Sequence, residues 1–192
     1  MCKSALYSFL ANPVYYLYDY YSSSVFQKNE ISSFDINIRE SVWNFKSGIE
    51  TSAVHEFYLN IVSMLTSVPG INTGSYALLL LPASSEARTN KRYGKLIAMI
   101  KRALPNLHII NDHIVFTGEK NIKHSSAERN VKSCSHFVCT GNIPEQNIIV
   151  FDDVITRGHT LRDAAEWLSQ FGPKNISYLC LARTVMKYAR VA

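Results

Sequence analysis

The sequence predicts an α/β fold in which helices flank a parallel sheet. Three apolar runs, 76–81, 148–151 and 176–182, have the length of strands, and a strand covered on both faces needs no alternation of apolar and polar residues. Segments with helical periodicity follow the first run at 93–104 and separate the other two at 161–168. Strands that alternate with helices in this way are typical of βαβ units with a parallel sheet.

The first 70 residues are expected to form an extension packed on a core of residues 71–192, the two making one structural unit. Apolar residues in 54–65 recur at helical spacing, and Pro69–Gly70 ends that helix. Five tyrosines within 13–21 predict packing for a short helix or strand, because tyrosine buries its ring and leaves its hydroxyl at the rim.

The composition fits one well-buried domain with an anionic partner. Of the 192 residues, 47% are hydrophobic and 18% are charged, and the net charge is +5. Phosphorylated metabolites and nucleic acid both fit this basic balance. Charge alone does not choose between them.

Cysteine usage and the amino terminus predict a cytoplasmic protein that does not contact a membrane. The four cysteines form no CxxC pair and are too few for a disulfide scaffold, which favours a reducing compartment. Cys134, His136 and Cys139 alternate as in a strand and have no apparent fourth zinc ligand, so buried thiols are expected. The apolar segment within residues 1–10 is too short for a signal peptide core or a membrane span.

One stretch, 148–161, carries most of the functional information. Asp152 and Asp153 follow its apolar run directly, at the end of a strand where ligands bind in open α/β sheets. A Thr-x-Gly-x-Thr turn and a helix come next, and the N–H groups and hydroxyls of such a turn can surround a phosphate at the helix N-terminus. Gly158 permits the positive φ that this turn needs. Taken singly these residues also fit turns and helix caps, but their order indicates a site for a phosphorylated sugar.

The same stretch resembles the phosphoribosyl pyrophosphate (PRPP) motif of type I phosphoribosyltransferases. The resemblance implies a parallel sheet flanked by helices, with an N-terminal helical and aromatic extension and a hood. It implies that Asp152 and Asp153 hold the ribose hydroxyls, directly or through the waters of a bound Mg²⁺, and stabilise the cation that develops on the sugar. The 5′-phosphate would contact the turn residues, which are Thr156, Arg157, Gly158, His159 and Thr160. The family more often has small residues in place of Arg157 and His159.

In this family the first core strand leads to a loop that binds pyrophosphate. The loop after the first apolar run contains Ser84, Ser85 and Arg88, which are expected to contact pyrophosphate because charge-assisted contacts to phosphate are strong. Lys91 and Arg92 are further candidates. The alternative is an ordinary helix N-cap at Ser84 or Ser85, followed by solvated basic residues.

The family also has a mobile hood that covers the reacting centre and contributes a basic residue. The polar stretch 117–130 occupies the corresponding place, with Arg129 as the catalytic candidate and Lys123 as the other basic candidate. A polar surface loop would have the same composition. The flanking segments 107–116 and 136–139 are expected to be strands, the second one a short edge strand.

A second resemblance lies upstream of the core. ComF-type phosphoribosyltransferase-like proteins carry a segment that looks like the one formed here by Arg39, Val42, Trp43, Phe45, Lys46 and Gly48. This sequence does not contain the cysteine-rich zinc module that precedes the segment in many of those proteins.

These resemblances imply an enzyme that transfers ribose 5-phosphate from PRPP to a nitrogenous base or amine and releases pyrophosphate, with Mg²⁺ as cofactor. The acceptor is unidentified, and residues 183–185 are expected to contact it. The alternative is a non-catalytic regulator that binds PRPP or a nucleotide and is associated with nucleic acid, which is the less favoured partner. A homodimer or an accessory role in a larger assembly is left open. Asp153→Asn is expected to abolish transfer but keep the fold, because an exposed site acid usually contributes to function rather than stability.

Overall fold

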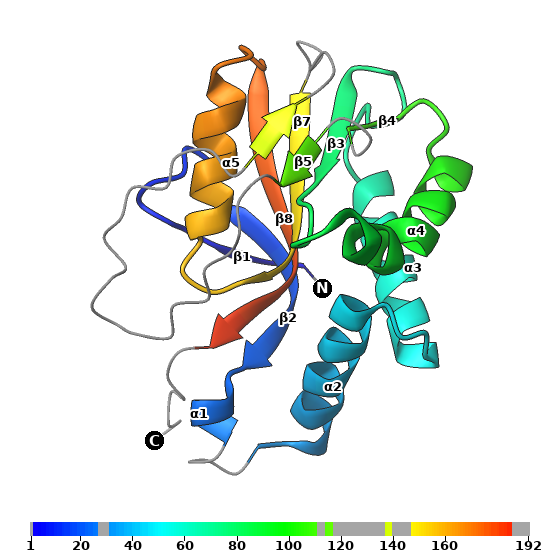
Figure 1. Cartoon of the computed structure of the whole chain (residues 1–192), viewed down its shortest axis with the longest axis vertical. Coiled ribbons are helices and arrows are strands. Elements are labelled where there is room, and N and C mark those ends of the chain that lie inside the picture. Colours follow the sequence, from blue (N-terminus) through cyan, green and yellow to red (C-terminus); the bar gives the residue numbers. More distant parts are fainter. Residues whose placement is uncertain (1, 27–30, 111–113, 117–136, 140–146, 186–192) are drawn as a thin grey trace.

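A six-stranded sheet forms the centre of the fold (Figure 1). The computed structural model describes residues 2–26, 31–110, 114–116, 137–139 and 147–185. Across the sheet the strands are β1 (Lys3–Ala5), β2 (Val14–Tyr21), β8 (Asn175–Val185), β7 (Asn147–Ile155), β3 (Tyr76–Leu80) and β4 (His108–Ile109). In this sheet β1 pairs antiparallel with β2, and every other neighbouring pair is parallel.

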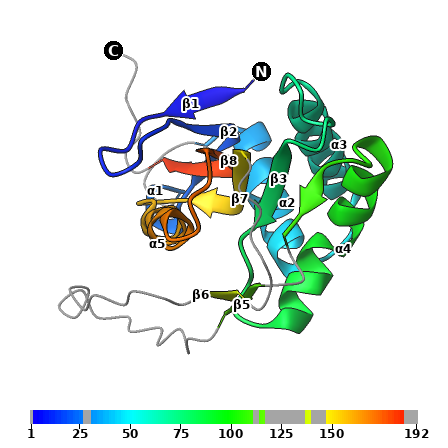
Figure 2. The same ribbon diagram turned by 90° about the horizontal axis from the view of Figure 1, so that it is seen from above.

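Helices cover both faces of the sheet (Figure 2). The helices are α1 (Ser23–Phe26), α2 (Ser33–Ser47), α3 (Ser52–Thr66), α4 (Glu86–Ala103) and α5 (His159–Ser169). The longest three, α2, α3 and α4, pack on one face, and α5 packs on the other. Each face therefore has its own apolar core.

The central strand β7 shows why its sequence is continuously apolar. Ile149 and Phe151 point into the core shared with α2, α3 and α4, whereas Ile148 and Val150 point into the core shared with α5. A strand buried on both faces has no solvated face that would need polar residues. The predicted class, an α/β fold with a parallel sheet flanked by helices, is confirmed.

Several element boundaries differ from those expected. The strand predicted to end at residue 151 continues to Ile155, because its pairing with β8 continues through Val154 and Ala182. The helix expected to begin at residue 93 begins at Glu86, after a Ser85 N-cap. The helices expected at 54–65 and 161–168 are confirmed as α3 and α5.

The tyrosine-rich segment forms β2, between β1 and β8. Its first residues alternate as in a strand, with Val14 and Tyr16 buried and Tyr15 exposed. The first 70 residues therefore supply two strands of the main sheet as well as helices. The division at residue 70 into an extension and a core stays a prediction.

A second, two-stranded antiparallel sheet lies outside the main one. It is formed by β5 (Ile114–Phe116) and β6 (Phe137–Cys139). The strand expected over 107–116 is thus divided between β4 and β5, and the one expected at 136–139 pairs with β5. Within the described ranges, no helix has the length and apolar character needed to cross a membrane.

Candidate functional site

The two acids of the PRPP-like motif lie at the carboxyl end of β7, where β3 has already ended. The last contact between these strands is a hydrogen bond of 2.9 Å from the Leu81 N–H to the Phe151 carbonyl. Beyond it, the Asp152 carboxylate accepts the Asp153 N–H at 2.8 Å, and the Asp153 carboxylate accepts the Val154 N–H at 2.6 Å. The acids thus help to fix the backbone at the edge of the sheet.

Asp152 and Asp153 face opposite sides of the sheet, as successive residues of a strand do. Asp152 lines a pocket together with the turn before α5. Asp153 is only 4% exposed and points toward α2 and α4, where its carboxylate lies 3.3 Å from Lys46 Nζ and 2.5 Å from Arg92 Nη1. The expectation that Asp153 is an exposed site acid is therefore wrong. Two cations from separate helices reach its carboxylate, and the sequence alone does not show these contacts.

The pocket on the Asp152 side, called here the phosphate-loop pocket, has a volume of about 490 Å³. It is lined by Ser22, Asp152, residues 154–161 and Thr184. All five turn residues expected to bind phosphate are among these. Ser22, which follows β2, and Thr184, which lies in β8, add hydroxyl groups to the pocket. The Thr184 hydroxyl lies 2.9 Å from the Thr156 hydroxyl.

The turn before α5 is suited to an anion. Gly158 is the N-cap residue, with φ of 76°, and no side chain caps the helix. The first N–H groups of α5 are therefore not satisfied by a side-chain cap, and they lie at the positive end of the helix dipole. Thr160 lies in this first turn and is exposed.

Gly158 is required for a second reason, which the sequence did not reveal. A Cβ added to it would lie 2.9 Å from Phe9 and 3.3 Å from Tyr7, in the connection between β1 and β2. The backbone of the turn is therefore covered by aromatic rings from the amino-terminal segment. No spacing pattern links residues so far apart in the chain.

The loop after β3 is organised as a helix cap. The Ser85 hydroxyl accepts the Arg88 N–H at 3.3 Å, and the Arg88 guanidinium donates to the Ser84 hydroxyl at 3.0 Å. Thr89 closes the turn by accepting the Ala83 N–H at 2.9 Å. The N-cap alternative thus describes Ser85 correctly. All three residues expected to bind pyrophosphate remain exposed, and that role stays a prediction.

The Asp152 carboxyl group differs in its pKa from a free carboxyl group. Burial, and then the charge of Asp153, raises the pKa of Asp152 to about 7. The Tyr93 hydroxyl is buried on the Asp153 side without a hydrogen-bond partner among the described residues. Burial, and then the charge of Asp153, raises the pKa of Tyr93 well above its usual value. Cys180 pairs with Asp152 across β7 and β8, and burial likewise raises the pKa of its thiol.

The ComF-like segment forms α2 and its end. Val42 and Phe45 are fully buried in the core. Arg39 donates to the Tyr21 carbonyl at 2.7 Å and to the Ser23 hydroxyl at 2.9 Å, which ties α2 to the end of β2. Lys46 instead reaches Asp153. Most of this pattern thus has a structural explanation, and the ComF-like assignment stays a prediction.

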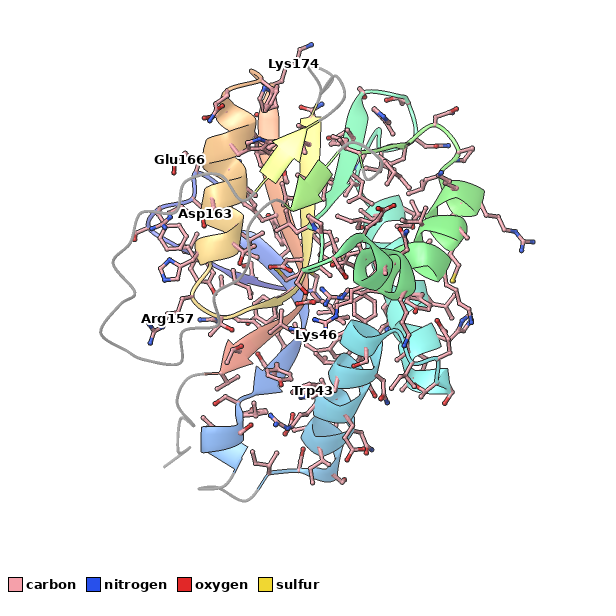
Figure 3. All side chains as sticks on the ribbon, viewed as in Figure 1. Trp43, Lys46, Arg157, Asp163, Glu166 and Lys174 are labelled. Carbon is pink, nitrogen blue, oxygen red and sulfur yellow. The ribbon has the colours of Figure 1, made fainter. Side chains whose placement is uncertain are left out.

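The side-chain view separates the two sides of the site (Figure 3). Trp43 and Lys46 lie on α2, one turn apart, whereas Arg157 lies across the sheet before α5. Arg129 and Lys123, the hood candidates, fall outside the described residues, as do Cys134 and His136.

The described residues offer Mg²⁺ little beyond one carboxylate in the phosphate-loop pocket. No group of three or more His, Cys, Asp or Glu side chains that could hold a metal occurs among them. Mg²⁺ is commonly held by one or two carboxylates, with substrate phosphates and water completing the shell. Asp152 therefore fits an ion that arrives with its ligand, whereas Asp153 is already bound by Lys46 and Arg92.

Comparisons with known proteins give matches to solved structures only. No family model and no curated protein matches the chain. A purine phosphoribosyltransferase from Pyrococcus horikoshii Ot3 is 18% identical with a TM-score of 0.38, over 68% of this chain and 72% of that one. A hypoxanthine-guanine phosphoribosyltransferase from Bacillus anthracis is 17% identical with a TM-score of 0.36, over 79% and 74%. A hypoxanthine phosphoribosyltransferase from Staphylococcus aureus is 10% identical with a TM-score of 0.35, over 76% and 73%. Similarity at this level carries no conclusion about the substrate of this chain.

Proposed function

We propose that the chain is a phosphoribosyltransferase that binds PRPP in the phosphate-loop pocket. The observation that carries this proposal is that Asp152 shares one pocket with an uncapped helix N-terminus and the hydroxyls before it. A carboxylate that can accept sugar hydroxyls and a turn that can hold a phosphate are the two contacts a phosphorylated ribose needs.

Each part of the pocket has a role in this proposal. Residues 156–160 hold the 5′-phosphate, with the N–H groups of the first turn of α5 directed at its oxygens. Asp152 accepts the ribose hydroxyls. Ser84, Ser85 and Arg88 lie at the carboxyl end of the neighbouring strand β3, and they are assigned the pyrophosphate. The acceptor and its contacts at residues 183–185 remain unassigned.

The chemistry breaks the bond between ribose C1 and the pyrophosphate oxygen and forms a bond from C1 to the acceptor nitrogen. Pyrophosphate leaves with the bonding electron pair, and the acceptor nitrogen loses a proton. When bound with PRPP, Mg²⁺ would neutralise charge on the leaving pyrophosphate. The ionised Asp152 carboxylate stabilises the positive charge that develops on the sugar.

Calorimetric titration with PRPP, with and without Mg²⁺, tests the proposal. Asp152→Asn and Thr160→Val should each weaken binding at least about tenfold, because each removes a charged or hydrogen-bonding contact to the ligand. Asp163→Asn is the matched control, since it removes a carboxylate of α5 that does not line the pocket. Equal binding by all three variants and the unmodified protein, or no binding of PRPP at all, would contradict the proposal.

The second candidate is a regulator that binds PRPP or a nucleotide without transferring it. The contact of Asp153 with Lys46 and Arg92 favours it, because this leaves one acid, not two, facing the pocket. Release of pyrophosphate in a screen of bases and amines distinguishes the candidates. An enzyme releases pyrophosphate with one of them, whereas a regulator binds PRPP and releases none.

A further inference from the structure

A second concavity opens on the α2 and α4 face of the sheet and is called here the basic pocket. Its volume is about 420 Å³, and its lining residues are Trp43, Lys46, Ser47, Arg88, Lys91 and Arg92. It shares no lining residue with the phosphate-loop pocket. Its size lies within the range of small-molecule sites.

The basic pocket carries an excess of positive charge. Asp153 contacts two of its four cations, Lys46 and Arg92. Within the described part of the chain, Arg88 and Lys91 have no carboxylate partner. The pocket thus has four cations, and Asp153 offsets only part of their charge. This excess of positive charge favours a ligand with several negative charges, such as a chain of phosphates.

The walls of the basic pocket are held close together. Gly48 ends α2 with φ of 64°, and a Cβ on it would lie 2.6 Å from the backbone oxygen of Lys91. Arg92 also donates to the Lys46 carbonyl at 3.3 Å. The end of α2 thus packs directly on α4, and the spacing between their cations is set by backbone contacts rather than by long side chains alone.

Trp43 gives the basic pocket an aromatic wall. It is 56% exposed and lies one helical turn from Lys46 on α2 (Figure 3), so the two side chains share a face of the helix. An aromatic ring beside a cluster of cations suits a ligand that has both phosphates and a flat base. Stacking of a base on such a ring strengthens binding.

We infer that the basic pocket is a second ligand site that takes a nucleoside di- or triphosphate. The phosphates contact Lys46 and Lys91, and the base stacks on Trp43. This inference goes beyond PRPP binding, because Trp43, Lys46 and Lys91 are not assigned to PRPP and line a pocket on the α2 and α4 face of the sheet. It holds or fails independently of transferase activity.

The test uses ADP as the probe and two readouts, calorimetry and tryptophan fluorescence. The chain has two tryptophans, of which Trp167 is only 7% exposed, so a stacked base should quench the emission of Trp43. Trp43→Ala should weaken ADP binding at least about fivefold, because stacking contributes on the order of 1–3 kcal/mol. Lys91→Met should weaken it about tenfold through loss of a charge-assisted contact.

Matched variants and probes separate this site from others. Lys95→Met removes a cation of α4 that pairs with Glu50 and does not line the pocket, and it should leave ADP binding unchanged. Thr160→Val alters the phosphate-loop pocket and should also leave it unchanged. Loss of binding in Thr160→Val with none in Lys91→Met would place ADP in the phosphate-loop pocket and overturn the inference.

Two further ligands test the chemical class. Inorganic tripolyphosphate lacks a base, so Trp43→Ala should leave its binding unchanged while it weakens that of ADP, and an equal loss for both ligands would overturn the role of Trp43. A short single-stranded oligothymidylate should bind no tighter than ADP. Much tighter binding of the strand, with a steep loss of affinity as salt rises, would replace the nucleotide by nucleic acid and so overturn the inference.

Discussion

The guanidinium of Arg92 lies 2.5 Å from the carboxylate of Asp153, and this ion pair joins α4 to the end of β7. Lys46 adds a second cation from α2, with its Nζ 3.3 Å from the same Asp153 carboxylate. The second acid of the motif therefore connects three elements on the face opposite the phosphate-loop pocket. Its first effect is on stability, and its effect on any ligand is indirect.

Asp153→Asn should lower the free energy of unfolding by about 2–4 kcal/mol, because it leaves the largely buried Arg92 without its counter-charge. Arg92→Met should cost a similar amount. The double variant should cost less than the sum of the two, since the first change already removes the interaction. Urea unfolding of all four proteins gives the coupling energy.

The surface pair of Arg162 and Asp163, 3.2 Å apart, provides the control for this cycle. Asp163→Asn should change stability by less than about 1 kcal/mol, as is usual for exposed pairs. An equally small effect of Asp153→Asn would mean that the buried ion pair does not stabilise the fold.

The close approach of α2 and α4 at Gly48 gives a second prediction. Gly48→Ala should destabilise the protein by about 2 kcal/mol or more, because an added Cβ would be both strained at positive φ and pressed against the Lys91 backbone. Gly74→Ala is the matched control, with φ of 81° and nothing within 4 Å of the added Cβ. It measures the cost of the backbone conformation alone, about 1 kcal/mol.

Thermal unfolding of the two alanine variants isolates the contact between the helices. The Gly48 variant should unfold at the lower temperature. Equal shifts in the two proteins would show that α2 can move away from α4 at little cost, and the basic pocket would then lack the fixed walls described above.

The raised pKa of Asp152 gives a third prediction, on stability and pH. Its pKa of about 7 in the folded state lies above the ordinary value of 3.8, so the folded state binds the proton more tightly than the unfolded state does. Stability from this group is therefore present below about pH 4 and is lost as pH rises toward 7. Asp152→Asn, which cannot ionise, should be more stable than the unmodified protein above pH 7, by on the order of 1–3 kcal/mol.

Unfolding in urea at pH 5 and pH 8, in a chelating buffer, measures this difference. The advantage of Asp152→Asn should be larger at pH 8 than at pH 5. Bound cations would hide the effect, which is why the chelator is needed. The same advantage at both pH values would mean that Asp152 titrates as an ordinary carboxyl group.

The sequence was sufficient where the fold and the candidate site depend on residues that are adjacent in the chain. The apolar strand, the acids and the Thr-x-Gly-x-Thr turn are adjacent in the chain, so their meeting at the end of β7 could be predicted from sequence spacing. The contacts of Asp153 could not, because Lys46 and Arg92 come from helices far earlier in the chain and meet it only through the packing of α2 on α4. The same holds for Phe9, which reaches Gly158 only because β1 and β2 join the main sheet.

Phe9 and Gly158 give the last prediction. Gly158→Ala should lower stability by about 1–3 kcal/mol, since the residue sits at φ of 76° and a Cβ would meet the Phe9 ring at 2.9 Å. When Phe9→Ala is added to Gly158→Ala, the protein should regain the stability lost through crowding but not the stability lost through backbone strain. Unfolding of the double variant separates the two, and PRPP titration then shows which part matters for the phosphate loop. If crowding alone distorts the loop, the double variant should regain PRPP affinity. If the positive φ is essential, affinity should stay low, because the N–H groups of the turn would no longer converge on one phosphate.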